Sequence, residues 1–300
     1  MTVQTEVYGT GEFVLRDFGE ISYDAATVSS GENLAAGAVL GRKTKRQAAA
    51  PIPTIVGTGT GLMSALSFGP DVQVGSYVIT LLATSATAAF SVVAPDGTAL
   101  KNGAVGTAYT SSHLSFSIAN GGTMTIGDAY TVVVTAGGTP VLVGTGTGVV
   151  SSFTLGQKAQ NGTYRVQLLA TSATAEFEVI APDGGKLKRG QVATAYASDH
   201  VNFTLANGGT MTSGDYFNFV VANGTNEVVA WDPTATDGTQ DPAGILFAAT
   251  NASSASAKAT MVARLAEVKA SMLSWKSGVS AAAIVACKAR QLPVLNIIAR

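Results

Sequence analysis

The chain has 300 residues, a formal net charge of −1 and a hydrophobic fraction of 46%, enough apolar material for packed cores, which excludes a globally disordered protein. Charged residues make up only 12%, about half the usual share, and without a broad basic face we expect no sequence-independent binding of nucleic acid. Because the chain has one cysteine and neither a signal-peptide pattern nor an apolar run of roughly 18 residues, we expect folding in a reducing cytoplasm without a disulfide or a membrane partner.

The first fifty residues differ in pattern from those that follow. They contain two short segments rich in apolar residues, 12–15 and 33–41, and then a short basic island at residues 42–46. The island could contact nucleic acid or an acidic protein surface. We interpret it instead as the solvated edge of a linker, because nucleic-acid binding needs a broader basic face.

A long internal repeat dominates the middle of the chain. The sequence Gly-Thr-Gly-Thr-Gly at residues 57–61 recurs at 144–148, which is an offset of 87 residues. Of the 80 positions in residues 56–135, 46 are identical at this offset, so the two copies must share one fold. A unit of this length is too long for a solenoid repeat and has the size of a small domain.

Each copy contains four segments that are typical of strands, and the second and third of them alternate apolar and polar residues, as half-buried strands do. Pro-Asp-Gly follows the second segment and Asn-Gly-Gly follows the third, and both are turn signals. This pattern predicts two tandem β-sandwiches of immunoglobulin-like architecture, without the paired cysteines and buried tryptophan of true immunoglobulin domains. The predicted strands are 76–82, 90–93, 114–118 and 130–134 in the first copy, and 163–169, 177–180, 201–205 and 217–221 in the second.

The C-terminal part returns to a mixed pattern. Residues 259–275 favour a helix by propensity alone, because they are rich in Ala, Met, Leu, Glu and Lys. Residues 280–291 are rich in alanine and predict a helix that ends at Pro293. The apolar residues 294–298 then predict a closing strand.

The two flanks of the repeat together resemble a known family. Val-Ala-Trp-Asp at 229–232, Thr-Asp-Gly at 236–238, Ala-Gly-Ile-Leu-Phe-Ala-Ala at 243–249 and a segment ending in a tryptophan at 267–275 occur in the order and spacing of the head-decoration proteins of tailed bacteriophages, typified by the lambda capsid-stabilising protein. Residues 34–41 are similar to the strand that precedes this signature. The residues that carry the resemblance, expected in the core or trimer contact of the decoration domain, are Trp231, Asp232, Asp237, Gly238, Gly244, Ile245 and Trp275.

The repeat fits the same family. Longer members carry one inserted β module with a Gly-Asp pair before its last strand, and this chain has such pairs at 127–128 and 214–215. Two inserts instead of one are a departure from that pattern. The expected domains are 1–50 for the arm and first part of the decoration domain, 51–138 and 139–224 for the two modules, and 225–300 for its second part.

The resemblance implies a structural virion protein. Members bind the outer surface of an expanded capsid as homotrimers at three-fold sites, contact the major capsid protein and cement the shell. It also implies that residues 259–275 form strand rather than helix, and that an N-terminal arm at about residues 2–17 extends a capsid strand by β-augmentation. The apolar anchors of this arm would be Val7, Tyr8, Phe13, Val14 and Leu15.

Candidates for chemistry are few, and we predict no catalytic, cofactor-binding or metal-binding residue. The glycine-rich segments lack the following helix and lysine of a phosphate loop. His113 and His200 lie one in each module, and Cys287 has no histidine near it in sequence, so neither a metal site nor an activated thiol is predicted. Four aspartates lie next to glycine without forming a full calcium ligand set. They are Asp96, Asp128, Asp183 and Asp215.

The leading hypothesis is therefore a capsid decoration protein of the virion surface, made in the host cytoplasm, with no enzymatic activity. The alternative is a bacterial surface adhesin or stalk built from immunoglobulin-like repeats. In either case the modules could bind a host-surface glycan. A third option, an enzyme with accessory β modules, lacks a recognisable catalytic constellation.

Overall fold

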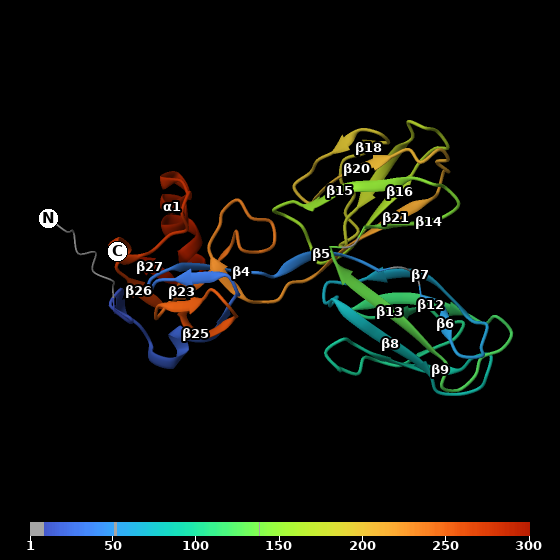
Figure 1. Cartoon of the computed structure of the whole chain (residues 1–300), viewed down its shortest axis with the longest axis horizontal. Helices are drawn as coiled ribbons and strands as arrows, with labels where there is room; N and C mark the ends of the chain where they lie inside the picture. The colour runs from blue at the N-terminus through green and yellow to red at the C-terminus, as the bar shows by residue number, and fades with distance from the viewer. Residues whose placement is uncertain (1–8, 51–52, 138) are drawn as a thin grey trace. The chain divides into compact units, whose positions relative to one another are not determined.

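The computed structural model describes residues 9–50, 53–137 and 139–300. The protein is mainly β, with one α-helix, α1 (Ala281–Ala286), near the C-terminus, which confirms the predicted fold class (Figure 1). The chain divides into two compact units. We call residues 1–44 and 224–300 the split unit, and residues 45–223 the insert unit.

The split unit is built around a closed barrel of five strands, to which both ends of the chain contribute. Its strands enclose a core of alternating apolar side chains, including Val28, Leu40, Val228 and Leu246. Strand β2 lies parallel to β22, and the remaining neighbours are antiparallel. In barrel order the strands are β2 (Tyr23–Val28), β22 (Val228–Ala230), β4 (Val39–Arg42), β23 (Pro242–Leu246) and β25 (Ala257–Val262).

Smaller elements complete the split unit. A three-stranded sheet has β26 in its centre, with β1 and β27 at its edges, and β3 pairs with β24. Short 3₁₀ helices η1 and η2 connect these strands. The bounds are β1 (Val14–Arg16), η1 (Gly19–Ser22), β3 (Glu32–Leu34), β24 (Thr250–Ala252), β26 (Ala266–Val268), η2 (Ala270–Met272) and β27 (Ile297–Ala299).

The C-terminal helix begins where the Ser280 hydroxyl accepts a hydrogen bond from the backbone N–H of Ala283 at 3.2 Å. It continues as a π-helical turn, η3 (Cys287–Gln291), and a 3₁₀ turn, η4 (Leu292–Leu295). The α-helical and π-helical run ends at Gln291, where the predicted helix 280–291 ends, and Pro293 lies at the start of the 3₁₀ turn that follows, where a proline needs no N–H partner. The chain then turns at Asn296, which has a φ of +55°.

Residues 259–275 form β25, β26 and η2 rather than a helix. The prediction from propensity was therefore wrong, and the strand prediction from the family resemblance was right. Tertiary pairing decides this segment: six consecutive residues of β25 pair with β2, which lies more than two hundred residues earlier in the chain.

The insert unit contains the two repeated modules, and all eight predicted strands are present. Each module packs a large sheet against a sheet of three strands, and the side chains between them form one core per module. The first module has β6 (Ile55–Val56), β7 (Leu62–Phe68), β8 (Gly75–Leu81), β9 (Ala89–Val93), β10 (Gly103–Ala104), β11 (Tyr109–Thr110), β12 (Leu114–Ala119) and β13 (Ala129–Ala136). The second has β14 (Val141–Val143), β15 (Val149–Leu155), β16 (Gly162–Leu168), β17 (Glu176–Ile180), β18 (Gly190–Gln191), β19 (Ala195–Tyr196), β20 (Val201–Ala206) and β21 (Tyr216–Asn223).

One strand that the sequence did not reveal joins the modules. Strand β5 (Lys45–Ala49) pairs with β13 of the first module and with β21 of the second, so the large sheets form one sheet of eleven strands. Lys45 and Arg46 are half-buried within β5, and Ala48 is fully buried. The basic island is therefore not the solvated edge of a linker, since its second half is a central strand.

Candidate functional site

The tryptophan of the family-like signature lies in the core of the split unit. Trp231 follows β22 and is 1% exposed, and its indole Nε1 donates a hydrogen bond to Gln240 O at 2.8 Å. Its ring meets that of Trp275 edge to face, with 5.7 Å between centroids. The ammonium group of Lys288, from η3, lies 5.7 Å from the Trp275 ring. These residues therefore connect the barrel to the C-terminal helix.

The aspartates of the signature fix the turns around this core. Asp232 accepts a hydrogen bond from Lys276 Nζ at 2.6 Å and two from Thr234, and the contact with Lys276 lowers the pKa of Asp232 to about 2. Asp237 accepts hydrogen bonds from the backbone N–H and the hydroxyl of Thr239. Asp237 thus fixes its own turn, and Asp232 also ties this region to Lys276.

Gly238, Gly244 and Ile245 are buried in the split unit. Gly238 has a φ of +105°, and a Cβ there would overlap Thr44 Oγ1 and lie 2.7 Å from Arg42 O, so only glycine fits. Gly244 and Ile245 lie in β23, where the Ile245 side chain joins the core around Trp231. The signature is therefore a structural framework, and its predicted role in a trimer contact stays a prediction.

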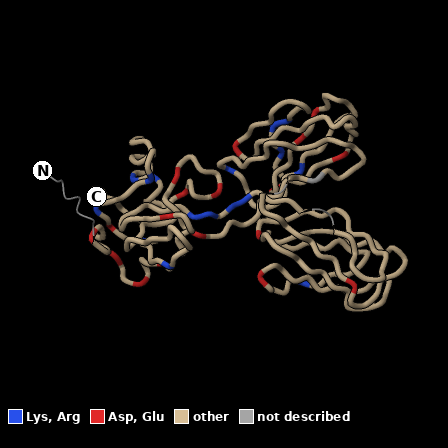
Figure 2. The backbone as a smooth tube through the Cα atoms, in the orientation of Figure 1, with Lys and Arg blue, Asp and Glu red and all other residues tan. Residues whose placement is uncertain are grey.

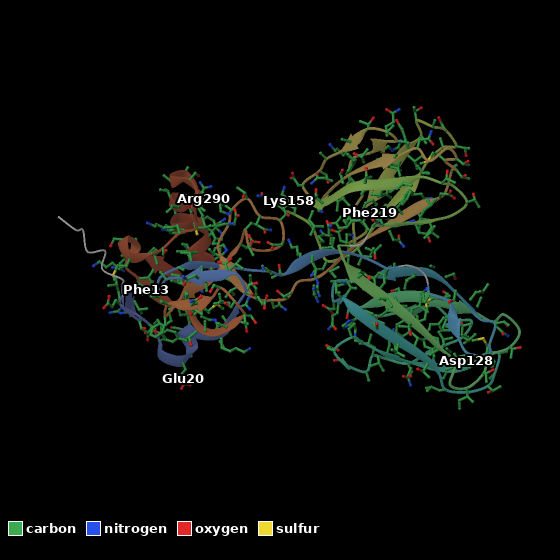
Figure 3. The ribbon with its side chains drawn as sticks, in the orientation of Figure 1. Phe13, Glu20, Asp128, Lys158, Phe219 and Arg290 are labelled. Carbon is green, nitrogen blue, oxygen red and sulfur yellow. The ribbon has the colours of Figure 1, made fainter. Side chains whose placement is uncertain are left out.

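The predicted anchors of the N-terminal arm occupy different environments. Val7 and Tyr8 lie outside the described residues. Phe13, labelled in Figure 3, is 1% exposed in the core of the split unit. Val14 is half-buried and Leu15 is 54% exposed. Only Leu15, among the anchors that the structure describes, is thus freely available to a partner.

Two further exposed apolar residues follow Leu15 closely. Phe18 is 65% exposed, and Ile21, in η1, is 61% exposed. Neither residue was predicted as a contact residue from the sequence, although three large apolar residues spaced three apart within seven positions were a visible signal. Because exposed apolar patches often mark contacts with other molecules, this segment is a candidate contact surface.

The histidines and aspartates of the modules have structural partners. Asp128 accepts hydrogen bonds from the backbone N–H groups of Thr58 and Gly59 at 3.1 and 2.6 Å, and Asp215 holds the second glycine-rich segment in the same way. His113 Nδ1 lies 3.2 Å from the hydroxyl of Tyr77, a contact that His200 repeats with its own tyrosine. Among the described residues no group of three or more His, Cys, Asp or Glu could hold a metal ion.

Cys287 is fully buried, and burial raises the pKa of its thiol to about 12. The thiolate that a nucleophile requires is therefore suppressed. Cys287 packs with Trp231, Ile245 and Leu292 as a small apolar core residue.

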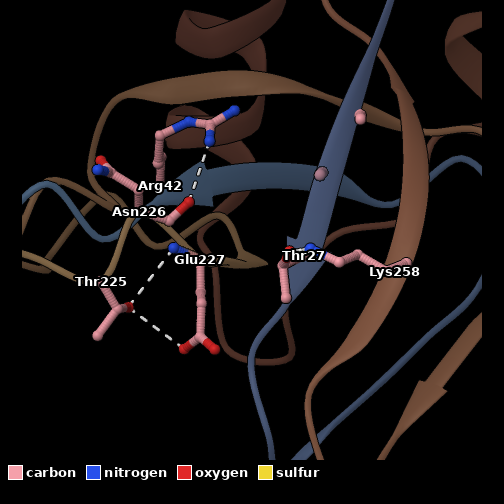
Figure 4. Close-up of a pocket in the computed structure, with 8 residues that line it drawn as sticks. Thr27, Arg42, Thr225, Asn226, Glu227 and Lys258 are labelled. Atoms are coloured by element: carbon pink, nitrogen blue, oxygen red, sulfur yellow. Dashed lines mark hydrogen bonds between the residues drawn. The ribbon is translucent and has the colours of Figure 1, made fainter. Parts of the chain in front are cut away.

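A pocket of about 430 Å³ lies in the split unit (Figure 4). Its polar groups satisfy one another: Arg42 Nη1 donates to Asn226 O at 3.0 Å, and Thr225 Oγ1 donates to Glu227 at 3.2 Å. Lys258 donates to a threonine hydroxyl in β2. The lining offers no nucleophile held by a base, so the pocket lacks the arrangement of an active site.

The helices of the described part of the chain are too short or too polar to span a bilayer. Searches of curated proteins and of solved structures gave no match. The family model described as bacteriophage lambda head decoration protein D matches residues 3–297. Because this match covers nearly the whole length, the chain belongs to the phage head decoration protein family, a family of structural capsid proteins.

Proposed function

We propose that this protein binds the outer surface of an expanded phage capsid as a homotrimer and cements the shell. The family match over residues 3–297 carries this proposal. It is supported by the split unit, in which β2 and β4 from the first part of the chain close one barrel with β22, β23 and β25 from the last part. The two flanks that carry the sequence signature thus fold into one compact unit.

The capsid contact is assigned to the segment around Leu15, Phe18 and Ile21, which are 54%, 65% and 61% exposed. Burying a side chain of this size against a partner contributes about 1.5–3 kcal/mol. Strand β1, which begins this segment, lies at the edge of its sheet and can accept a further strand. Three such segments in one trimer would act together through their effective concentration, so each contact can be weak.

The two modules are accommodated without disturbing the split unit. The chain leaves the split unit at Thr44 and returns at Gly224, and Gly224 N donates a hydrogen bond to Thr44 O at 3.0 Å. The exit and return points are therefore adjacent, as in the stem of a hairpin. In a deletion variant, residues 45–223 are replaced by the dipeptide Asn-Gly, which then links Thr44 to Gly224. This variant should leave a folded split unit, because Asn-Gly forms a two-residue turn.

The decisive experiment mixes the purified protein with expanded empty capsids and images them by electron microscopy. We expect additional density at the three-fold sites, and the deletion variant should occupy the same sites without the density of the modules. Absence of binding by the full-length chain would overturn the proposal. The alternative, a surface adhesin or stalk, predicts binding to cells or glycans and none to capsids.

Substitutions test the assigned segment. Leu15→Asp, Phe18→Asp and Ile21→Asp should each weaken capsid binding, because a carboxylate at the contact would have to be desolvated. Val294→Asp is the matched control, since Val294 is 79% exposed in the same unit but outside the segment. If all four substitutions had equal effects, the capsid contact could not be assigned to this segment. The proposal that the protein binds capsids would still stand.

A further inference from the structure

The two modules of the insert unit contact each other through different surfaces. The second module contributes the outer face of its large sheet, and the first contributes the edge strand β7. Thr163 Oγ1 accepts a hydrogen bond from Phe68 N at 2.6 Å, and Asn218 Nδ2 donates one to Leu66 O at 2.8 Å. Val220, on the same face, is 1% exposed and packs in the core of the first module. This contact is heterologous, so each half of it exists once more in the repeated sequence without its partner.

The outer sheet face with which the second module contacts β7 has an equivalent on the first module, and that equivalent face is uncovered. The 87-residue offset relates its three contact positions to Ser76, Thr131 and Val133, which keep the hydroxyl, the donor and the valine. All three residues are exposed, and Val133 is 44% exposed whereas Val220 is 1% exposed. The first module therefore presents the same kind of surface without a cover.

A pair of equivalent glycines shows the same difference. Gly162 and Gly75 have φ values of +123° and +131°. A Cβ on Gly162 would lie 3.2 Å from Phe68 O, so the glycine permits the close approach of β7. At Gly75 the three nearest atoms all belong to Pro95 of the same module, and no β7-like backbone occupies the corresponding place.

The edge strand β7, with which the first module makes the contact, also has an equivalent on the second module. Strand β15 is the counterpart of β7, and each lies at the edge of a three-stranded sheet with the same bulge, marked by a φ of +55° at Ala65 and at Ser152. Ser67 of β7 is half-buried, whereas its counterpart Thr154 is exposed. The second module thus carries an uncovered copy of the edge that the first module uses.

The outer sheet faces of the two modules differ in charge. This difference favours a contact on the face of the first module. Figure 2 shows few charged residues along the strands of the first module. Its exposed Val78 is replaced in the second module by Arg165, which stacks on Tyr216 at 3.8 Å, and Glu178 there pairs with Lys186 at 2.9 Å. The face of the first module can be covered without desolvating a charge.

We propose that the open sheet face of the first module binds strand β15 of a second copy of this chain, in the arrangement that β7 and the second module make within one chain. The partner is identified by the repeat: both halves of the contact are present on every copy, and one chain uses each only once. Such a contact is head-to-tail, and it links neighbouring copies wherever they are held close together. It does not depend on binding to a capsid.

Cross-linking between full-length chains tests the proposal. Chains with Ser76→Cys are mixed with chains with Thr154→Cys and treated with a short bis-maleimide, to which the buried Cys287 contributes little background. The matched control replaces Ser76→Cys by Ser64→Cys, an exposed serine of β7 in the same module. We expect a cross-linked heterodimer in several-fold higher yield from the Ser76 mixture than from the Ser64 mixture. A single chain with Ser67→Cys and Thr163→Cys should cross-link internally and shows that the contact geometry suits the reagent.

A charge placed on the face provides the second measurement. Val133→Lys in the Ser76→Cys chain should lower the heterodimer yield several-fold, whereas Leu62→Lys, at a position 70% exposed, should leave it unchanged. Equal yields from the Ser76 and Ser64 mixtures, with the internal control cross-linked, would overturn the proposal. Because these substitutions lie in the insert unit, capsid binding should persist in all of them, which separates this test from that of the proposed function.

Discussion

The repeat supplies its own control for a test of the contact between the modules. Val220 is 1% exposed at that contact, and its repeat equivalent Val133 is 44% exposed on an open face. Val220→Ala removes two methylene equivalents from a packed site, which should cost about 2 kcal/mol with the cavity included. Val133→Ala removes the same atoms and the same strand propensity from a site in contact with water, so we expect less than about 1 kcal/mol.

The assay combines urea unfolding with hydrogen exchange. Unfolding midpoints give the free-energy difference between the two variants. Hydrogen exchange of β7 reports the contact itself, because β7 supplies the groups that Thr163 and Asn218 hold. We expect faster exchange of β7 in Val220→Ala, although the substitution lies in the other module, and unchanged exchange in Val133→Ala.

Equal destabilisation in the two variants would contradict a packed contact between the modules. So would a loss of protection in Val220→Ala that stayed within β21 and left β7 unchanged. Either result would show that the modules are tethered by β5 without sharing a packed contact.

Three other predictions follow from single side chains. Asp128→Ala and Asp215→Ala each remove the acceptor of two backbone N–H groups, so each should destabilise its module by about 2–3 kcal/mol and speed hydrogen exchange in the adjacent glycine-rich segment. Cys287 should resist a thiol reagent at pH 8 in the native protein and react after unfolding, because burial raises its pKa to about 12; rapid native reaction would contradict the buried assignment. The pKa of Asp232 is depressed to about 2, so its contribution to stability is present above its unfolded pKa of 3.8 and is lost as the pH falls toward 2. Asp232→Asn should therefore be less stable than the native chain by at most about 2 kcal/mol at pH 6, with the difference vanishing near pH 2 in urea titrations.

Patterns that are local in sequence were sufficient to predict the strands of the modules. Period-two alternation, with turn signals at 95–97 and 120–122, places strands without knowledge of their partners. The same holds for the C-terminal helix, whose alanines favour helix before any packing. Wherever the local pattern and the tertiary partner agreed, the sequence sufficed.

Elements defined by distant partners could not be found in this way. Strand β5 reads as a basic island, yet it pairs with residues 135–136 and with residues 220–223. Residues 259–275 have helix-forming composition, yet they form strands because β2 is there to pair with them. In both segments intrinsic propensity is worth only a few tenths of a kcal/mol per residue, which ladder pairing and burial exceed.

The residues of the candidate site also fall into those that the sequence predicted and those that it did not. The resemblance selected Trp231 and Asp237 from their spacing, and in the structure Trp231 is buried in the core of the split unit while Asp237 fixes the turn at Thr239. Phe18 and Ile21 carry no family motif, and the structure distinguishes them from core residues by the exposure of their side chains. A motif records what the fold requires, whereas a contact surface for a partner consists of residues that the fold leaves exposed.

The adjacency of Thr44 and Gly224 explains how a decoration protein can carry two modules where one would serve. Because the stem of the insertion is closed by a hydrogen bond within the split unit, lengthening the insertion adds only loop-closure entropy, about 0.6 kcal/mol for each doubling. Duplication of a module inside such a stem is thus nearly neutral for the split unit. The duplication instead affects the modules themselves, because β5 can join two large sheets only if both copies are present. In the joined pair, the sheet face of the second module and the edge strand β7 are covered. Their equivalents, the sheet face of the first module and β15, stay open. The duplication that made the contact within the chain therefore also made the two surfaces through which neighbouring copies can meet.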